Sequence, residues 1–61
     1  MSKYLPYVKI HRKDGDLAVF ENGKPLYDTF EQAASVGESI RTDMLQVDTN
    51  CNPTVFVLEQ S

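Results

Sequence analysis

The chain has 61 residues, of which 41% are hydrophobic and 25% are charged, and its formal net charge is −3 at pH 7. This composition excludes a disordered tail, and the length limits the protein to a single domain, residues 1–61, with a small core. A single cysteine, Cys51, and a single histidine, His11, exclude an internal disulfide and a four-ligand zinc site. We therefore expect no cofactor, and we expect a partner chain to supply additional stability.

Cysteine usage and hydropathy favour a cytoplasmic, soluble protein. A lone cysteine suits a reducing compartment, and the first residues lack the apolar run of a signal peptide. No segment approaches the roughly 18 consecutive apolar residues of a membrane-spanning helix. The negative net charge also argues against a nucleic-acid backbone as the main partner.

The first expected element is a strand over residues 4–11. Val8 and Ile10 stand two residues apart, and the segment is rich in β-branched and aromatic residues. Pro6 cannot donate a hydrogen bond to a neighbouring strand. The strand is therefore expected either to lie at a sheet edge or to begin after Pro6.

Two more extended segments are expected before a helix begins. A turn over residues 13–16 leads into a short strand over residues 17–21. Asn22 and Gly23 then favour a type I′ hairpin turn, which needs a positive φ at both positions. The sequence therefore predicts a third strand, at about residues 24–27, that runs back along the second.

A helix is expected immediately afterwards. Asp28 and Thr29 are both good N-cap residues, and Glu31 and Gln32 follow each by three residues, as in a capping box. Gly37 lies on the apolar stripe, which indicates either a close approach of the helix to the sheet or a tolerated glycine. The stripe has the three- and four-residue spacing of an amphipathic helix and consists of Phe30, Ala33, Ala34, Gly37, Ile40 and Met44.

The chain is expected to end in a fourth strand. The helix should fray over residues 44–47, turn-forming residues occupy 48–53, and residues 55–59 have strand character. The predicted fold is therefore α+β in the order β-β-β-α-β, with a small antiparallel sheet of three to four strands packed on one helix.

The segment from Asp48 to Glu59 partly matches a calcium-binding loop. Asp48, Asn50 and Asn52 occupy positions 1, 3 and 5 of such a loop, and Glu59 occupies position 12. Pro53, however, stands at position 6, where the loop requires glycine. We therefore interpret the segment as a connecting loop followed by a strand, and we expect no metal site.

Catalytic signatures are weak in this sequence. Cys51 and His11 are the one possible nucleophile and base pair, and they lie near opposite ends of the chain without a recognisable motif around them. The carboxylates Glu31 and Glu38 are more simply interpreted as the solvated face of the helix. We expect no enzymatic activity.

A basic cluster near the first turn supports an alternative function. Asp14 and Asp16 interrupt its positive charge, which favours a solvated turn. Tyr7 is available nearby for stacking on a base. The candidate nucleic-acid-binding residues of this alternative are Lys9, His11, Arg12 and Lys13.

Both faces of the predicted sheet are apolar. Within each strand, alternation separates two apolar sets: Val8 and Ile10 from Leu5 and Tyr7, Leu17 and Val19 from Ala18 and Phe20, and Val55 and Val57 from Phe56 and Leu58. Which set of each strand faces the helix stays open, because a register slip of one residue exchanges the two sets. One helix covers one face, so a second chain is expected to cover the other, unless short strands twist and Phe56 or Tyr27 folds over an edge. Aromatic residues are common in interface hot spots, and the candidate partner-binding residues are Tyr7, Phe20 and Tyr27.

The hairpin and helix resemble a group of small bacterial and phage-borne domains of unknown function. The resemblance covers about residues 7–41 and differs at Leu17, where the group usually has tryptophan. It implies strands backed by one helix, in the order βββαβ, with no activity attached. The matching elements are Leu17-Ala18-Val19, Gly23, Leu26-Tyr27 and DTFEQAA, Asp28 to Ala34.

These observations favour a non-enzymatic protein-interaction module. We expect a homodimer whose sheet surfaces or edge strands meet, or a complex with a larger protein in which this chain acts as an accessory protein, adaptor or inhibitor. Nucleic-acid binding through the basic cluster is the alternative.

Overall fold

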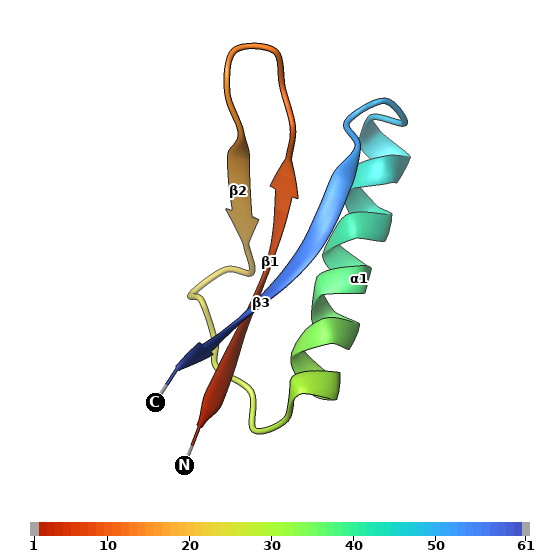
Figure 1. The fold of residues 1–61 in the computed structure, drawn as a ribbon. Coiled ribbons are helices and arrows are strands. Elements are labelled where there is room, and N and C mark those ends of the chain that lie inside the picture. The colour runs from red at the N-terminus through yellow and green to blue at the C-terminus, as the bar shows by residue number, and fades with distance from the viewer. Residues whose placement is uncertain (1, 61) are drawn as a thin grey trace.

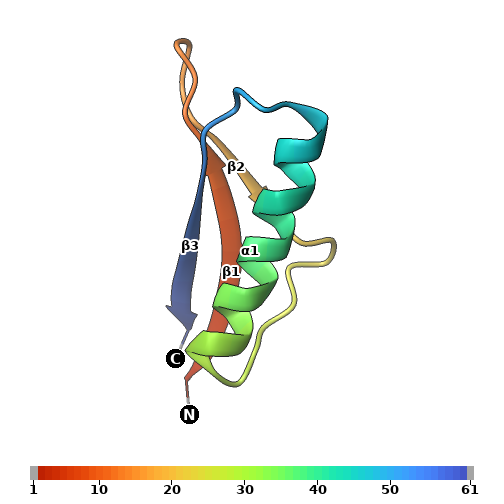
Figure 2. The same cartoon turned by 90° about the vertical axis from the view of Figure 1, so that its right-hand side faces the viewer.

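The computed structural model describes residues 2–60, which form three strands and one helix (Figure 1). These elements are β1 (Lys3–Ile10), β2 (Leu17–Phe20), α1 (Phe30–Val47) and β3 (Pro53–Gln60). The strands form one antiparallel sheet in the order β2-β1-β3, and α1 packs on one of its faces (Figure 2). The α+β class is confirmed, and the observed element order is β-β-α-β.

The core lies between α1 and the even-numbered side chains of β1. Successive strand residues point to opposite faces of a sheet, and Tyr4 meets the ring of Phe30 on α1, with ring centroids 6.1 Å apart. The even positions of β1 therefore face the helix. Among them Pro6 and Val8 are fully buried, and on α1 Ala33 is also 0% exposed. Because so few side chains are fully buried, the core is thin.

Pro6 lies inside the central strand, so the expectation that it marks an edge or precedes the strand is wrong. The reason is local. β2 pairs with β1 only as far as Phe20, which lies opposite Tyr7. Position 6 therefore faces a sheet edge on the β2 side, although β1 as a whole is central. A residue without an N–H group is tolerated at such an edge.

The start and the packing of α1 agree with the sequence. Thr29 is the N-cap, in an extended conformation, and its Oγ1 accepts a hydrogen bond from the N–H of Gln32 over 3.2 Å. Gly37 is buried, and a Cβ at this position would lie 2.5 Å from Cγ1 of Val55 on β3. The close approach expected at this glycine is therefore confirmed.

The expected third strand is not formed. Lys24 donates its N–H to the carbonyl of Glu21 over 2.9 Å, which closes a turn. The positive φ values fall on Gly23 (82°) and Lys24 (48°) and not on Asn22 and Gly23, so the turn is not type I′. The left-handed conformation at Lys24 directs the chain away from β2. Tyr27 instead forms an isolated bridge with Tyr4 of β1.

Candidate functional site

The face of the sheet away from α1, which we call the open face, carries a row of three aromatic rings. Phe20 on β2, Tyr7 on β1 and Phe56 on β3 are paired neighbours in the sheet. The ring centroids of Tyr7 and Phe20 are 5.1 Å apart, and those of Tyr7 and Phe56 are 5.3 Å apart, in stacked geometry. This aromatic row crosses all three strands, and its neighbouring rings cover both faces of the Tyr7 ring.

Lysine side chains lie at the two ends of the aromatic row. The Nζ atom of Lys24 is 4.7 Å from the Phe20 ring centroid, and that of Lys9 is 5.4 Å from the Phe56 ring centroid. Both distances are typical of cation–π contacts. The ammonium group of each lysine therefore lies against an outer ring of the aromatic row.

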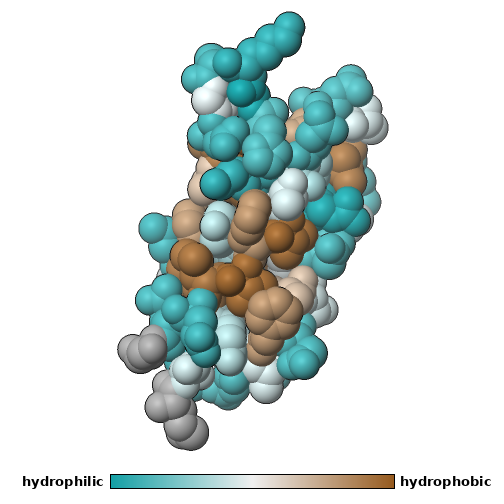
Figure 3. All heavy atoms as spheres, viewed as in Figure 1, coloured by the Kyte–Doolittle hydropathy of each residue, from teal (hydrophilic) through white to brown (hydrophobic). Residues whose placement is uncertain are grey.

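The apolar part of the open face is accessible to solvent. Leu58 lies opposite Leu5 in the register, next to the aromatic row. Phe56 is 36% exposed and Leu58 is 42% exposed. Figure 3 shows a continuous hydrophobic patch across the middle of this side of the molecule, with hydrophilic surface above and below it. A contiguous exposed apolar patch usually marks a contact surface.

Tyr27 does not join this surface. Residues paired directly across a sheet point to the same face, so the bridge with Tyr4 places Tyr27 on the α1 side. Its hydroxyl donates a hydrogen bond to Glu21 Oε2 over 2.6 Å. This bond, together with partial burial and the Glu21 charge, raises the pKa of Tyr27 above its ordinary value. Tyr27 therefore anchors the β2–α1 connection.

The residues of the basic cluster are separated in the structure. Lys9 lies on the open face beside Phe56. His11, Arg12 and Lys13 follow β1 in the exposed hairpin connection. The Nδ1 atom of His11 is 3.3 Å from Asp16 Oδ1. A carboxylate therefore lies among the positive charges of the cluster.

His11 also approaches Thr54, which gives a carboxylate–imidazole–hydroxyl arrangement. Its Nε2 atom is 3.4 Å from Thr54 Oγ1, while Nδ1 faces Asp16. This is the order of groups in a nucleophilic triad. All three side chains are exposed, however, and hydrogen bonds in contact with water activate a hydroxyl poorly. The arrangement is better suited to joining the ends of the three strands.

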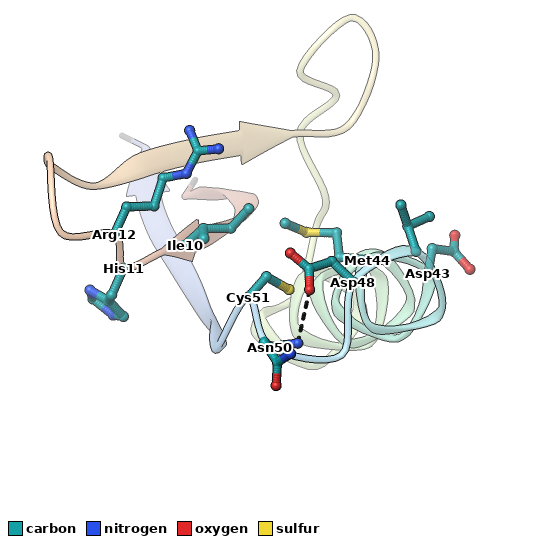
Figure 4. A pocket seen from close by; sticks show the side chains of 9 residues that line it. Ile10, His11, Arg12, Asp43, Met44, Asp48, Asn50 and Cys51 are labelled. Atoms are coloured by element: carbon teal, nitrogen blue, oxygen red, sulfur yellow. Dashed lines mark hydrogen bonds between the residues drawn. The ribbon is translucent and has the colours of Figure 1, made fainter.

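A hollow of about 560 Å³ opens between the end of β1 and the C-terminal part of α1. In Figure 4 the side chains of Ile10, Met44 and Cys51 gather around its centre, whereas His11 and Asp43 point away. Among residues 2–60 no group of three or more His, Cys, Asp or Glu side chains could hold a metal ion. The hollow is therefore a largely apolar depression, and the Asp48 carboxylate lies beside Met44 and Cys51 (Figure 4).

The segment that partly matches a calcium loop forms a turn and a strand. Asp48 Oδ1 accepts a hydrogen bond from the N–H of Asn50 over 3.0 Å, as expected for an Asx turn (Figure 4). Glu59 lies near the far end of the eight-residue strand β3. At about 3.4 Å per residue, Glu59 is too far from Asp48 and Asn50 for the three side chains to share one ion.

No known family model, curated protein or solved structure matched the chain. In the part of the chain that the structure describes, no helix is long and apolar enough to cross a membrane.

Sequence reasoning identified the open face but not all of its members. Tyr7 and Phe20 were expected there and lie there. The sequence analysis separates Phe56 and Leu58 from Val55 and Val57 within their own strand, but it does not name them as candidate partner-binding residues. Tyr27 is a candidate there because aromatic side chains are common in interface hot spots. The sequence signal for Phe56 is its position between Val55 and Val57. Because neighbouring strand residues point to opposite faces, Phe56 lies on the face away from those two valines.

Proposed function

We propose that this protein is a non-enzymatic, homodimeric protein-interaction module that acts as a small accessory protein, adaptor or inhibitor by docking its open face on a larger protein. The observation that carries this proposal is the aromatic row on the side of the sheet that α1 leaves uncovered, in which Phe56 is exposed and Tyr7 and Phe20 are half-buried. Large, rigid aromatic side chains contribute contact area at a low cost in conformational entropy.

The stacking geometry favours protein over nucleic acid as the partner. A base binds an aromatic side chain by stacking on an open ring face. Both faces of the Tyr7 ring are already covered by Phe20 and Phe56, and Lys24 and Lys9 lie over the outer rings. Ring edges are left for contact, and these suit an apolar protein surface better than a base. The negative net charge acts in the same direction.

The charges on the open face also indicate the chemistry of the partner. Lys9 and Lys24 lie at opposite ends of the aromatic row. An apolar surface flanked by carboxylates would therefore be complementary in shape and charge. A second copy of the same face would bring lysines against lysines, which is unfavourable when the contact excludes water. The occupant of the open face is accordingly a different protein with an acidic rim.

The test is an affinity pull-down from source cells with wild-type protein, a Phe56→Ser variant and a matched control. Val47 is suited to the control because it is 90% exposed on α1, away from the open face, so Val47→Ser removes a similar exposed apolar group. Any protein captured should then be purified and its affinity for the three forms measured by calorimetry. Circular dichroism of each form should establish that the fold is retained.

We expect the purified partner to bind the wild type and Val47→Ser with the same affinity and to bind Phe56→Ser at least tenfold more weakly, a loss of about 1.4 kcal/mol. Equal affinity for all three forms would contradict docking by the open face. A labelled single-stranded oligonucleotide is tested in parallel at about 50 mM salt. Oligonucleotide binding that Arg12→Glu abolishes would favour the alternative function instead.

A further inference from the structure

Along the outer edge of β3, backbone groups have no partner among residues 2–60. β3 ends the sheet and pairs with β1 on one side only (Figure 1). On the other side of β1, Tyr4 exchanges both backbone hydrogen bonds with Tyr27, over 2.9 and 2.8 Å. Successive strand residues direct their N–H and C=O groups to opposite sides. The even positions of β1 therefore point away from β3, and the odd positions point towards it.

The register then shows which residues of β3 point outward. Leu5 and Tyr7, at odd positions of β1, lie opposite Leu58 and Phe56, so the even positions of β3 bond to β1. The odd positions direct their backbone groups out of the sheet. Within residues 2–60 these outward groups have no backbone partner. The outward N–H donors belong to Val55, Val57 and Glu59.

This edge lacks the features that usually prevent pairing. Natural edge strands are short, or carry lysines, central prolines or a covering segment. The opposite edge is protected in this way, because β2 has four residues and Tyr27 bonds beyond its end. β3 has eight residues, its proline, Pro53, is at the first position, and its one charged residue is Glu59. The sheet therefore has one protected edge and one free edge.

We propose that the free edge of β3 binds β3 of a second copy in antiparallel pairing about a two-fold axis, which joins the two sheets into one of six strands. This inference rests on the homodimeric part of the proposed function and names its interface. In this pairing the odd positions of β3 in one copy bond to the odd positions of β3 in the other. Both helices then lie on one face of the joined sheet, and both open faces lie on the opposite face.

Charge and side-chain size favour a second copy in this orientation. An antiparallel two-fold places the two Glu59 carboxylates at opposite ends of the contact, whereas a parallel arrangement would place them side by side. In a register centred on Val57, Phe56 of each copy lies opposite Leu58 of the other, and both side chains are partly exposed in the single chain. The pairing also supplements a core in which few side chains are fully buried.

The joined sheet would present a larger open face to a third protein. Stable protein contacts bury about 800 Å² on each partner, and a sheet of three strands offers a limited apolar area. When two open faces lie side by side, the apolar area available for contact is approximately doubled. Dimerisation by the edge and docking by the face are therefore compatible.

Sedimentation equilibrium of the full chain at roughly 0.1 to 1 mM tests the proposal. The wild type should have twice the 6.9 kDa mass of one chain. Glu59→Pro removes an outward N–H group at an exposed position without removing a backbone bond to β1, and it should be monomeric. Glu59→Ala removes the same carboxylate but keeps the N–H group, and Phe20→Ser alters the open face away from the edge; both should remain dimeric. The Glu59 carboxylate accepts a hydrogen bond from the Tyr4 hydroxyl over 3.5 Å, which both Glu59 variants lose.

Amide hydrogen exchange of the wild type gives a second readout that needs no variant. The outward amides of Val57 and Glu59 should exchange at least tenfold more slowly at dimeric than at monomeric concentrations, because only pairing protects them. A wild type that stays monomeric would overturn both the edge interface and the homodimer, and would leave docking by the open face to its own test. A dimer that Phe20→Ser dissociates and Glu59→Pro does not, or one whose outward amides exchange rapidly, would overturn the edge interface alone.

Discussion

At the scale of single residues, the hydrogen bond from Tyr27 to Glu21 holds the connection between β2 and α1. The bond spans 2.6 Å and joins two residues that lie six positions apart in the chain. It stabilises the neutral phenol, because the hydroxyl proton is donated to a carboxylate, and this raises the pKa of Tyr27. Tyr27 is also held by its backbone bridge to Tyr4. The connection is therefore fixed at two points.

A Glu21→Gln substitution should lower the pKa of Tyr27 towards its ordinary value. Because folding raises this pKa, the stability that the bond contributes is fully present below about pH 10 and is lost as the pH rises through the raised pKa. Titration of the Tyr27 ring carbon by NMR would measure the shift. Glu31→Gln, which removes an exposed carboxylate on α1, should leave the Tyr27 pKa unchanged; equal effects of both variants would contradict this account.

Single-residue features were predictable from the sequence where local chemistry determines them. Residue type and spacing reduce the N-cap to Asp28 or Thr29 and Gly37 to a close approach or a tolerated glycine, and the structure shows Thr29 and the close approach. The position of Tyr27 was not predictable, because it depends on a bridge to a residue 23 positions earlier in the chain. The pairing of His11 with Asp16 likewise depends on how β1 and β2 align.

At the scale of elements, the contact between α1 and β3 depends on a missing side chain. A Cβ at Gly37 would lie 2.5 Å from Cγ1 of Val55, and a valine side chain has little freedom to rotate away. The helix therefore lies closer to β3 than any other residue at this position would permit. This close contact sets the separation of the helix and sheet layers.

A Gly37→Ala substitution should destabilise the protein, although alanine is the better helix former. Overpacking costs about 1 to 3 kcal/mol, and the gain in helix propensity is about 1 kcal/mol, so a net loss of about 1 kcal/mol is expected. Chemical denaturation would measure it. Ser39→Ala on the exposed side of α1 should be neutral or stabilising. In a Val55→Ala background Gly37→Ala should cost less; an equal cost in both backgrounds would exclude the steric explanation.

The elements themselves were largely predictable, with one exception. Residue alternation and capping chemistry located β1, β2, α1 and β3. The third strand was wrong because Asn22-Gly23 matches a hairpin turn in composition, whereas the backbone places the positive φ values on Gly23 and Lys24. The expectation for Pro6 was wrong for a related reason. Pro6 belongs to the central strand, but β2 ends opposite Tyr7, so no residue of β2 lies opposite Pro6. Both outcomes depend on the relative lengths of the strands.

At the scale of the whole molecule, the protein consists of two layers with one uncovered side. α1 covers the even positions of β1, and the odd positions form the open face with its aromatic row. The sequence predicted that both faces would be apolar. The order of the strands, and therefore the free edge of β3, could not be derived from the sequence, because residue alternation does not determine which strand becomes central.

The most direct test of the central claim, that the open face is the docking surface, is an amide chemical-shift map of the isotope-labelled protein with its purified partner. Docking by the open face should produce the largest shifts at Tyr7, Phe20, Phe56 and Leu58, with small shifts over the exposed side of α1. Largest shifts at Arg12 and Lys13, or around the hollow lined by Met44 and Cys51, would contradict it.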